Sequence, residues 1–146
     1  MNYALGEMLN PVTITLLGQP VPWARTQGGK TGQRFTPARQ RNNAATLRMA
    51  AMREMMFDAH KPFEEAVRLT ILAEFQIPKS WPKWRKNGAI LGESPHSSKP
   101  DLDNIIKQIK DAFKGVVYRD DALVSEISAK KRYGVQPKLV ITVSQA

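Results

Sequence analysis

Cysteine is absent from this chain, and histidine is scarce, with only His60 and His96. The absence of cysteine excludes disulfides, iron–sulfur clusters and cysteine-based zinc sites, together with cysteine nucleophiles. Two histidines are too few for a histidine-rich metal site. Any bound metal must therefore be held by oxygen ligands, which favours Mg²⁺ and also suits Mn²⁺.

Long apolar runs are missing as well. No stretch of the sequence approaches the roughly 20 apolar residues that a membrane span requires. The N-terminus also lacks the basic and apolar regions of a secretory signal. We therefore expect a cytoplasmic protein with no membrane segment.

Acidic residues are few relative to basic ones. The chain has 13 Asp and Glu against 22 Lys and Arg, which gives a formal net charge of +9. This balance favours a nucleic acid as partner, although a basic surface kept for solubility has the same composition. With 146 residues and 42% hydrophobic content, the chain is long and apolar enough for one folded domain. We expect a single domain over residues 1–146.

The hydrophobic patterns predict an α/β (α+β) domain with a mixed sheet and two main helices, in the order β-α-β-α-β-β. The strands are expected at 12–17, 67–77, 123–132 and 137–144, and the helices at about 37–58 and 102–113. In the strand at 67–77 apolar residues at every second position face one way, namely Val67, Leu69, Ile71, Ala73, Phe75 and Ile77. In the helix at 102–113 the apolar residues fall at helical spacing, namely Leu102, Ile105, Ile106, Ile109 and Phe113. A turn is expected at Tyr133-Gly134. Residues 23–36 are predicted to form a basic loop or loose hairpin, and residues 78–98, rich in Pro, Trp and Lys, a long loop.

The first predicted helix has apolar residues at near-helical spacing. Because this spacing gives one apolar face, we interpret these residues as core packing rather than as a ligand site. They are Ala44, Leu47, Ala51, Met55 and Met56.

Acidic residues, scarce elsewhere, gather in one window of the chain. Five of the 13 lie between residues 101 and 121, namely Asp101, Asp103, Asp111, Asp120 and Asp121. Carboxylates gathered within a basic protein indicate a hard-cation site close to a polyanion. A metal-dependent nuclease needs that combination.

The spacing of Asp101 and Asp103 sets a geometric condition. On an ideal helix the two side chains point about 200° apart, so they can share a metal only if Asp101 precedes the regular helix. Pro100 favours this arrangement because proline disfavours helical geometry in the residue before it. Lys107, four residues after Asp103, shares its face and could stabilise charge on a phosphate.

Asp120 and Asp121 come after this helix and a short return. A strand pairing near the helix start would carry one of them back beside Asp101 and Asp103. The alternative is structural, because Asp-x-Asp at a helix start often serves as a cap and Asp-Asp is common in turns. The residues alone leave both interpretations open.

The same window resembles the signature of the RusA-type Holliday junction resolvases over about residues 99–126. The matching residues are Lys99-Pro-Asp101-Leu-Asp103-Asn104-Ile-Ile-Lys107, then Asp111-Ala, Gly115 and Tyr118-Arg-Asp120-Asp121-Ala-Leu-Val124. The resemblance implies a homodimeric, Mg²⁺-dependent endonuclease that cuts four-way DNA junctions by paired symmetric nicks, in recombination and repair. It implies Asp101, Asp103 and Asp121 as catalytic metal-binding carboxylates, with Asp120 beside them, and Lys107 as the catalytic lysine.

Basic residues in several segments are candidates for binding branched DNA. They are Arg25, Lys30 and Arg34 in the first loop, Lys83, Arg85 and Lys86 near the tryptophans, and Lys99 beside the acidic motif. Lys130, Lys131 and Arg132 are further candidates, but they lie on a predicted strand and cannot all face one way. Trp81 and Trp84 could stack on splayed bases, although packing or dimer contacts are the favoured interpretation.

Two other functions fit the sequence less completely. One is a non-catalytic, basic nucleic-acid-binding module whose acidic cluster is structural. The other is a nucleotide-sugar transferase that uses Asp-x-Asp to hold Mn²⁺, which the short chain and the absence of an evident nucleotide-binding domain disfavour.

Overall fold

Four strands form the main sheet of the computed structural model, which describes residues 8–18, 20, 27–28, 34–35 and 38–146. β1 (Val12–Leu17), β4 (Val67–Gln76), β5 (Val124–Gly134) and β6 (Lys138–Gln145) lie in the order β1-β6-β4-β5. Because β6 is antiparallel to both neighbours and β4 is parallel to β5, the sheet is mixed, as predicted. A separate two-stranded sheet pairs β2 (Gln27–Gly28) with β3 (Arg34–Phe35), within the segment predicted as a loop or loose hairpin.

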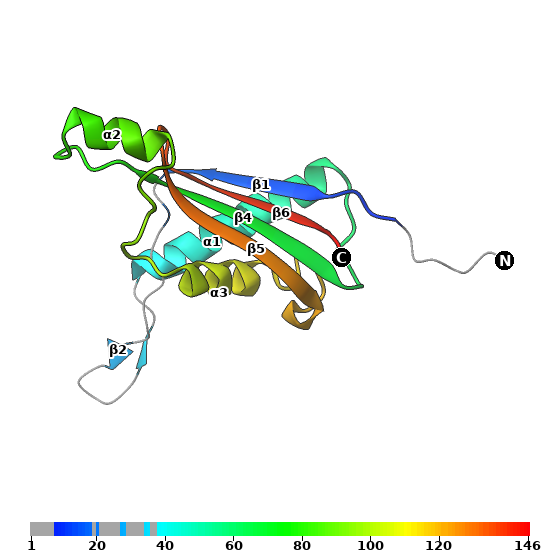
Figure 1. Ribbon diagram of the computed structural model, residues 1–146. Helices are drawn as coiled ribbons and strands as arrows, with labels where there is room; N and C mark the ends of the chain where they lie inside the picture. The colour runs from blue at the N-terminus through cyan, green and yellow to red at the C-terminus, as the bar shows by residue number, and fades with distance from the viewer. Residues whose placement is uncertain (1–7, 19, 21–26, 29–33, 36–37) are drawn as a thin grey trace.

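Two long helices cover one face of the sheet (Figure 1). α1 (Ala38–Phe57) contacts β1, α3 (Leu102–Phe113) contacts β5, and the two helices contact each other. Their positions agree closely with the helices predicted at 37–58 and 102–113. Together with the sheet they make a small single domain of the α+β class.

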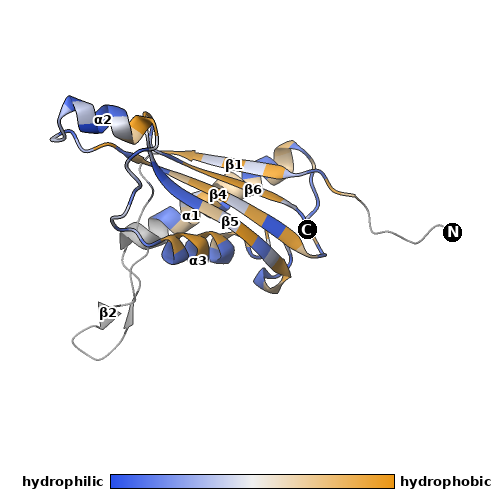
Figure 2. Ribbon diagram, viewed as in Figure 1, coloured by the Kyte–Doolittle hydropathy of each residue, from blue (hydrophilic) through white to orange (hydrophobic). Residues whose placement is uncertain are grey.

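The sheet has one apolar and one polar face. Along β4, the residues from Val67 to Phe75 at every second position are buried against the helices, while Arg68 and Thr70 are exposed. Figure 2 shows this alternation of apolar and polar residues along the strands. On the polar face the hydroxyls of Thr13 and Thr142 lie 3.1 Å apart. The alternation predicted from the sequence is therefore confirmed.

One predicted loop contains a helix. Residues 83–90, expected to be part of a long loop, form α2 (Lys83–Ile90). Just before it, Trp81 packs edge-on against Tyr133 at a ring-centroid distance of 5.0 Å, and the Arg85 guanidinium lies 3.6 Å from the Trp81 ring centroid. The sequence pattern missed α2 because these aromatic contacts, rather than an apolar periodicity, tie the segment to the sheet.

The apolar face of α1 is narrower than predicted. Leu47, Ala51 and Met55 are buried and Ala44 is half-buried, but Met56 is 79% exposed. Adjacent residues on a helix point about 100° apart, so Met55 and Met56 cannot both face the core. The prediction of Met56 as a core residue is wrong.

The turn between β5 and β6 lies later than predicted. β5 continues through Gly134, and the chain reverses over residues 135–137. A Cβ at Gly134 would lie 2.7 Å from Oε2 of Glu74, so glycine allows this buried carboxylate to approach the backbone. Arg132 Nε donates a 2.8 Å hydrogen bond to Glu74 Oε1. None of the helices in the described part of the chain is long and apolar enough to cross a membrane.

Candidate metal centre

Asp101 lies immediately before α3 with an extended backbone, at φ −68° and ψ 145°. This geometry satisfies the condition that Asp101 lie outside the regular helix. Asp103 lies in the first turn of α3 and is exposed. The Asp101 side chain makes no capping hydrogen bond to the helix. Both carboxylates of this leading pair, Asp101 and Asp103, therefore remain available at the positive end of the helix.

The packing of α3 fixes which of its residues face outward. Ile105, Ile109 and Phe113 are buried in the core, as their spacing predicted. Asp103 and Lys107 are both exposed. The helix therefore presents an acidic residue and a lysine, one turn apart, on its outer side.

Lys99 neutralises part of the leading pair. Its Nζ lies 2.7 Å from Oδ2 of Asp101, and the two side chains are 79% and 48% exposed. An ion pair this exposed contributes only about 0–1 kcal/mol. A divalent cation with stronger affinity for the carboxylate can therefore displace the lysine.

Further along α3, Lys107 contacts the next acidic residue. Its Nζ lies 3.3 Å from Oδ2 of Asp111, and both side chains are about half exposed. Since helical residues rise about 1.5 Å each, Lys107 lies roughly 6 Å along the axis from Asp103 and from Asp111. Lys107 is thus placed between two carboxylates on the same side of the helix.

The trailing pair, Asp120 and Asp121, lies where the chain turns into β5. Asp120 precedes a short 3₁₀ helix, η1 (Asp121–Leu123), and its Oδ1 lies 3.6 Å from Nζ of Lys114. A hydrogen-bonding contact with the Asp121 side chain, followed by the Lys114 ammonium and backbone N–H groups, lowers the pKa of Asp120. Asp120 therefore holds its negative charge beside Asp121.

Tyr118 anchors the return, the short segment between the end of α3 and Asp120. Its hydroxyl donates a 2.9 Å hydrogen bond to the carbonyl of Lys110 in α3. Burial raises the pKa of this hydroxyl, and the charges of Asp121 and Asp111 raise it further. Tyr118 therefore stays a neutral donor that ties the return to the C-terminal half of α3.

The leading and trailing pairs lie at opposite ends of α3. The Lys131 ammonium of β5 contacts the carbonyl of Pro100, at the helix start, whereas β5 begins at Val124, just after the trailing pair. Seven residues of extended strand span roughly 23 Å. Tyr118 accordingly pairs with Phe63 and Lys114 rather than with the segment before α3.

The expected strand pairing near the helix start is therefore wrong. Because β4 and β5 are parallel, the connecting helix must run back along the sheet, and the segment after α3 emerges at the far end of the helix. Among the residues that the structure describes, no three acidic or histidine side chains form one group that could hold a metal. The donor chemistry still fits a divalent cation, since Asp101 and Asp103 supply hard oxygen ligands and both lie at the start of α3.

The candidate DNA-binding residues fall into several settings. Lys83 is exposed at the start of α2, Lys86 is half-buried, and Trp84 between them is 75% exposed. Trp81 packs against the core, as favoured from the sequence, whereas Trp84 does not. Arg25 and Lys30 lie outside the described residues, and Arg34 is described only as part of β3.

The basic residues Lys130, Lys131 and Arg132 divide between the two faces of β5, as the alternation of side chains along a strand requires. Lys131 faces the helices, while Lys130 and Arg132 face the other way, with Arg132 bound to Glu74. Strand alternation shows that Lys131 differs from its neighbours, but the sequence does not show which face is covered. From the sequence, Lys131 is therefore predicted only as one of several basic residues that could bind DNA.

Comparison with known proteins shows which family this chain is similar to. Residues 18–144 match the family described as "Endodeoxyribonuclease RusA". The chain is also 27% identical over 143 residues to "Uncharacterized protein YqaN" of Bacillus subtilis (strain 168), a match covering 92% of this chain and 96% of that protein. The family match includes α3 and both acidic pairs.

Proposed function

The chain belongs to the RusA endodeoxyribonuclease family, and from this membership we propose that it resolves four-way (Holliday) DNA junctions by metal-dependent hydrolysis during recombination and repair. The observation that carries the proposal is the extended backbone of Asp101 directly ahead of α3, with Asp103 in the first helical turn. This geometry allows two carboxylates, two residues apart, to serve one cation.

Asp101 and Asp103 would hold the divalent ion, with Mg²⁺ as the expected metal and Mn²⁺ as a substitute. When bound, such an ion polarises a phosphoryl oxygen and lowers the pKa of a bound water. The protein's own part is to keep both carboxylates exposed. The exposed ion pair between Lys99 and Asp101 is weak enough for the cation to displace the lysine.

Lys107 is proposed as the catalytic lysine. It lies one helical turn beyond Asp103 on the exposed side of α3. A positive charge at this distance would stabilise negative charge that develops on a phosphate held at the helix start. Asp111, 3.3 Å away, restrains the ammonium within this region.

Asp121 and Asp120 are proposed as metal ligands because they match the family motif, and not because they lie near Asp101 and Asp103. They lie at the far end of α3 from Asp101, so their part in holding the metal is a separate claim with its own test. The hydrogen-bonding contact that lowers the pKa of Asp120 supports a negative charge on Asp120 at this position.

The proposed DNA contacts are basic residues near the leading pair and on α2. Lys83, Arg85 and Lys86 belong to α2, and Lys99 precedes Asp101. A formal net charge of +9 favours binding to phosphate backbones. Arg25, Lys30 and Arg34 complete the proposed set. Paired symmetric nicks require two active sites, so we propose that the protein acts as a homodimer.

The decisive assay compares a synthetic four-way junction with a linear duplex of the same sequence, with and without Mg²⁺. We expect Mg²⁺-dependent paired nicks in the junction only. Asp101→Asn should bind the junction with unchanged affinity but cut it at least ~10³-fold more slowly, because one metal ligand is lost. Asp58→Asn, which removes an exposed carboxylate at the end of α1, is the matched control and should cut normally.

Normal cleavage by Asp101→Asn would overturn the mechanism. A second candidate, a non-catalytic nucleic-acid-binding module, is favoured by the lysine partners of Asp101, Asp111 and Asp120, since such pairs are also typical of a structural cluster. A stable wild type that binds branched DNA without Mg²⁺-dependent nicking would establish that module instead.

A further inference from the structure

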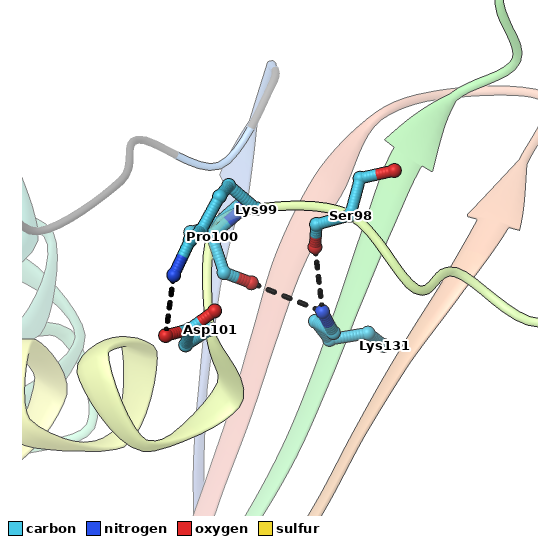
Figure 3. A network of polar contacts seen from close by, with 5 residues as sticks. All are labelled: Ser98, Lys99, Pro100, Asp101 and Lys131. Atoms are coloured by element: carbon cyan, nitrogen blue, oxygen red, sulfur yellow. Dashed lines mark hydrogen bonds and ion pairs between the residues drawn. The ribbon is translucent and has the colours of Figure 1, made fainter.

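Lys131 joins β5 to the segment that leads into α3. Its ammonium donates a 2.8 Å hydrogen bond to the carbonyl of Ser98 and a 3.1 Å hydrogen bond to the carbonyl of Pro100 (Figure 3). These carbonyls flank Lys99, so the backbone wraps around the ammonium just before Asp101. Figure 3 shows Lys131 reaching the segment from the strand, on the opposite side of the backbone from the Lys99–Asp101 ion pair.

The position of Lys131 in the sheet makes this contact fixed rather than incidental. Lys131 pairs in register with the fully buried Ala73 of the central strand β4, and its next neighbour on the same face is the buried Tyr133. The backbone of Lys131 is thus paired into the sheet next to buried residues. Its two hydrogen bonds therefore tie the segment before α3 to β5.

Asp101 depends on its backbone for its position. Its side chain makes no capping hydrogen bond to α3, and its ion-pair partner Lys99 is 79% exposed. An exposed lysine on a flexible stem restrains a carboxylate weakly. The backbone just before Asp101, which Lys131 clamps, therefore determines where the carboxylate points.

We propose that Lys131 is a positioning residue, which holds Asp101 in the extended geometry that lets it share a cation with Asp103. This inference rests on the proposed metal-dependent function. Lys131 contacts neither the carboxylates nor the DNA in this role, and it acts through two backbone carbonyls. Groups that orient metal ligands in this way commonly contribute about 10–100-fold to metal affinity.

The competing role for Lys131 is that of a simple surface cation that attracts DNA. Its neighbour Lys130 provides the comparison, because it carries the same charge on the same strand but faces the other side of the sheet and is exposed. A role in attracting DNA would make the two lysines equivalent. A role in positioning Asp101 would make them different.

The test replaces each lysine with methionine, which keeps most of the side-chain volume and removes the charge and the donors. Mn²⁺ binding to the full-length protein, followed by electron paramagnetic resonance, is the first readout. Lys131→Met should weaken Mn²⁺ binding at least ~10-fold, and Lys130→Met should leave it within about threefold of wild type. The Mg²⁺ concentration that gives half-maximal junction cleavage should shift by the same factors, with little change in the rate at saturating Mg²⁺.

Rescue identifies the hydrogen bonds as the cause. Lys131→Arg keeps a positive charge and several N–H donors on a long stem, so it should restore Mn²⁺ affinity to within about threefold of wild type. Junction affinity measured without metal should fall by the same small factor in Lys130→Met and Lys131→Met, since each variant loses one positive charge. If Lys131→Met does not fold, Lys131→Gln takes its place with the same thresholds, because glutamine keeps a polar head but cannot span both carbonyls.

Wild-type Mn²⁺ affinity in the Lys131 variant, or equal losses in the Lys130 and Lys131 variants, would overturn the inference. Failure of the proposed function has a different signature. In that case the wild-type protein itself would show neither Mn²⁺ binding nor Mg²⁺-dependent nicking, whatever residue stands at position 131.

Discussion

The two ends of α3 carry acidic residues in contrasting settings. At the start, Asp103 is exposed, and Asp101 pairs with the exposed Lys99 and makes no capping hydrogen bond to the helix. At the far end, Asp120 and Asp121 contact each other, and Lys114 and the Tyr118 return hold that region against the helix. The two acidic pairs, which lie within one short window of the sequence, thus differ in how readily their carboxylates can accept a new cation. This contrast assigns the proposed metal centre to the helix start.

After Asp101→Asn, the largest expected effect separates Asp103 from Asp111, two carboxylates eight residues apart on one side of α3. Asp103→Asn should lower single-turnover junction cleavage at saturating Mg²⁺ by at least ~10²-fold, because a metal ligand is lost. Asp111→Asn should stay within about threefold of wild type, since Asp111 lies two helical turns from Asp103 and pairs with Lys107 through an exposed ion pair. Equal losses in the two variants would erase the distinction between the two ends.

The next effect tests the trailing pair itself. If Asp121 belongs to the metal centre, Asp121→Asn should slow cleavage at least ~10-fold. Asp120→Asn, which removes the ion pair with Lys114 and alters the contact with Asp121, should slow it less than about threefold. The same single-turnover assay gives both numbers. Wild-type cleavage by Asp121→Asn would remove Asp121 from the site and leave the helix start alone.

A smaller effect concerns the stability of the far end. Tyr118→Phe removes the hydroxyl that donates to the Lys110 carbonyl, and should lower the free energy of unfolding in urea by about 1 kcal/mol without changing cleavage. Tyr133→Phe is the control, because the described residues provide its buried ring with no hydroxyl hydrogen bond. An equal loss in both variants would mean that the hydroxyl of Tyr118 does not stabilise the return.

The smallest expected effect is a pH dependence of the folding stability, caused by His96. Burial, then the charge of Lys131, lowers the pKa of His96, whose ring stacks on Phe75 at 4.0 Å. The unfolded chain therefore binds a proton on His96 more readily than the folded protein. The stability this neutral ring provides is present above pH 6.5 and is lost as pH falls below it.

Urea denaturation of His96→Phe across pH 5 to 8 measures this contribution. The variant should lose less stability than wild type between about pH 6.5 and 5, while the two curves run parallel above about pH 7.5, where histidine is neutral in both states. Parallel curves over the whole range would show that His96 does not resist protonation in the folded protein.

Much of the fold could be predicted from periodicity. The stripe of Ile105, Ile109 and Phe113 located α3, and the alternation of β4 identified its buried face, because burial against a core repeats with the geometry of the backbone. α2 was missed since its anchors, Trp81 and Arg85, contact each other and Tyr133 rather than repeating along the chain. Met56 was misassigned because methionine suits both a core and a surface.

The candidate site divides in the same way. By itself the sequence determined the residue types, the requirement that Asp101 precede the helix, and the exposed side of α3 that carries Asp103 and Lys107, since these depend on neighbours within a few positions. Only the tertiary structure decided that Asp121 lies at the far end of α3 and that Lys131 clamps the segment before Asp101. Both positions depend on the parallel pairing of β4 and β5, which fixes the direction of the helix between them. This pairing joins residues far apart in the sequence, so the spacing of neighbouring residues does not reveal it.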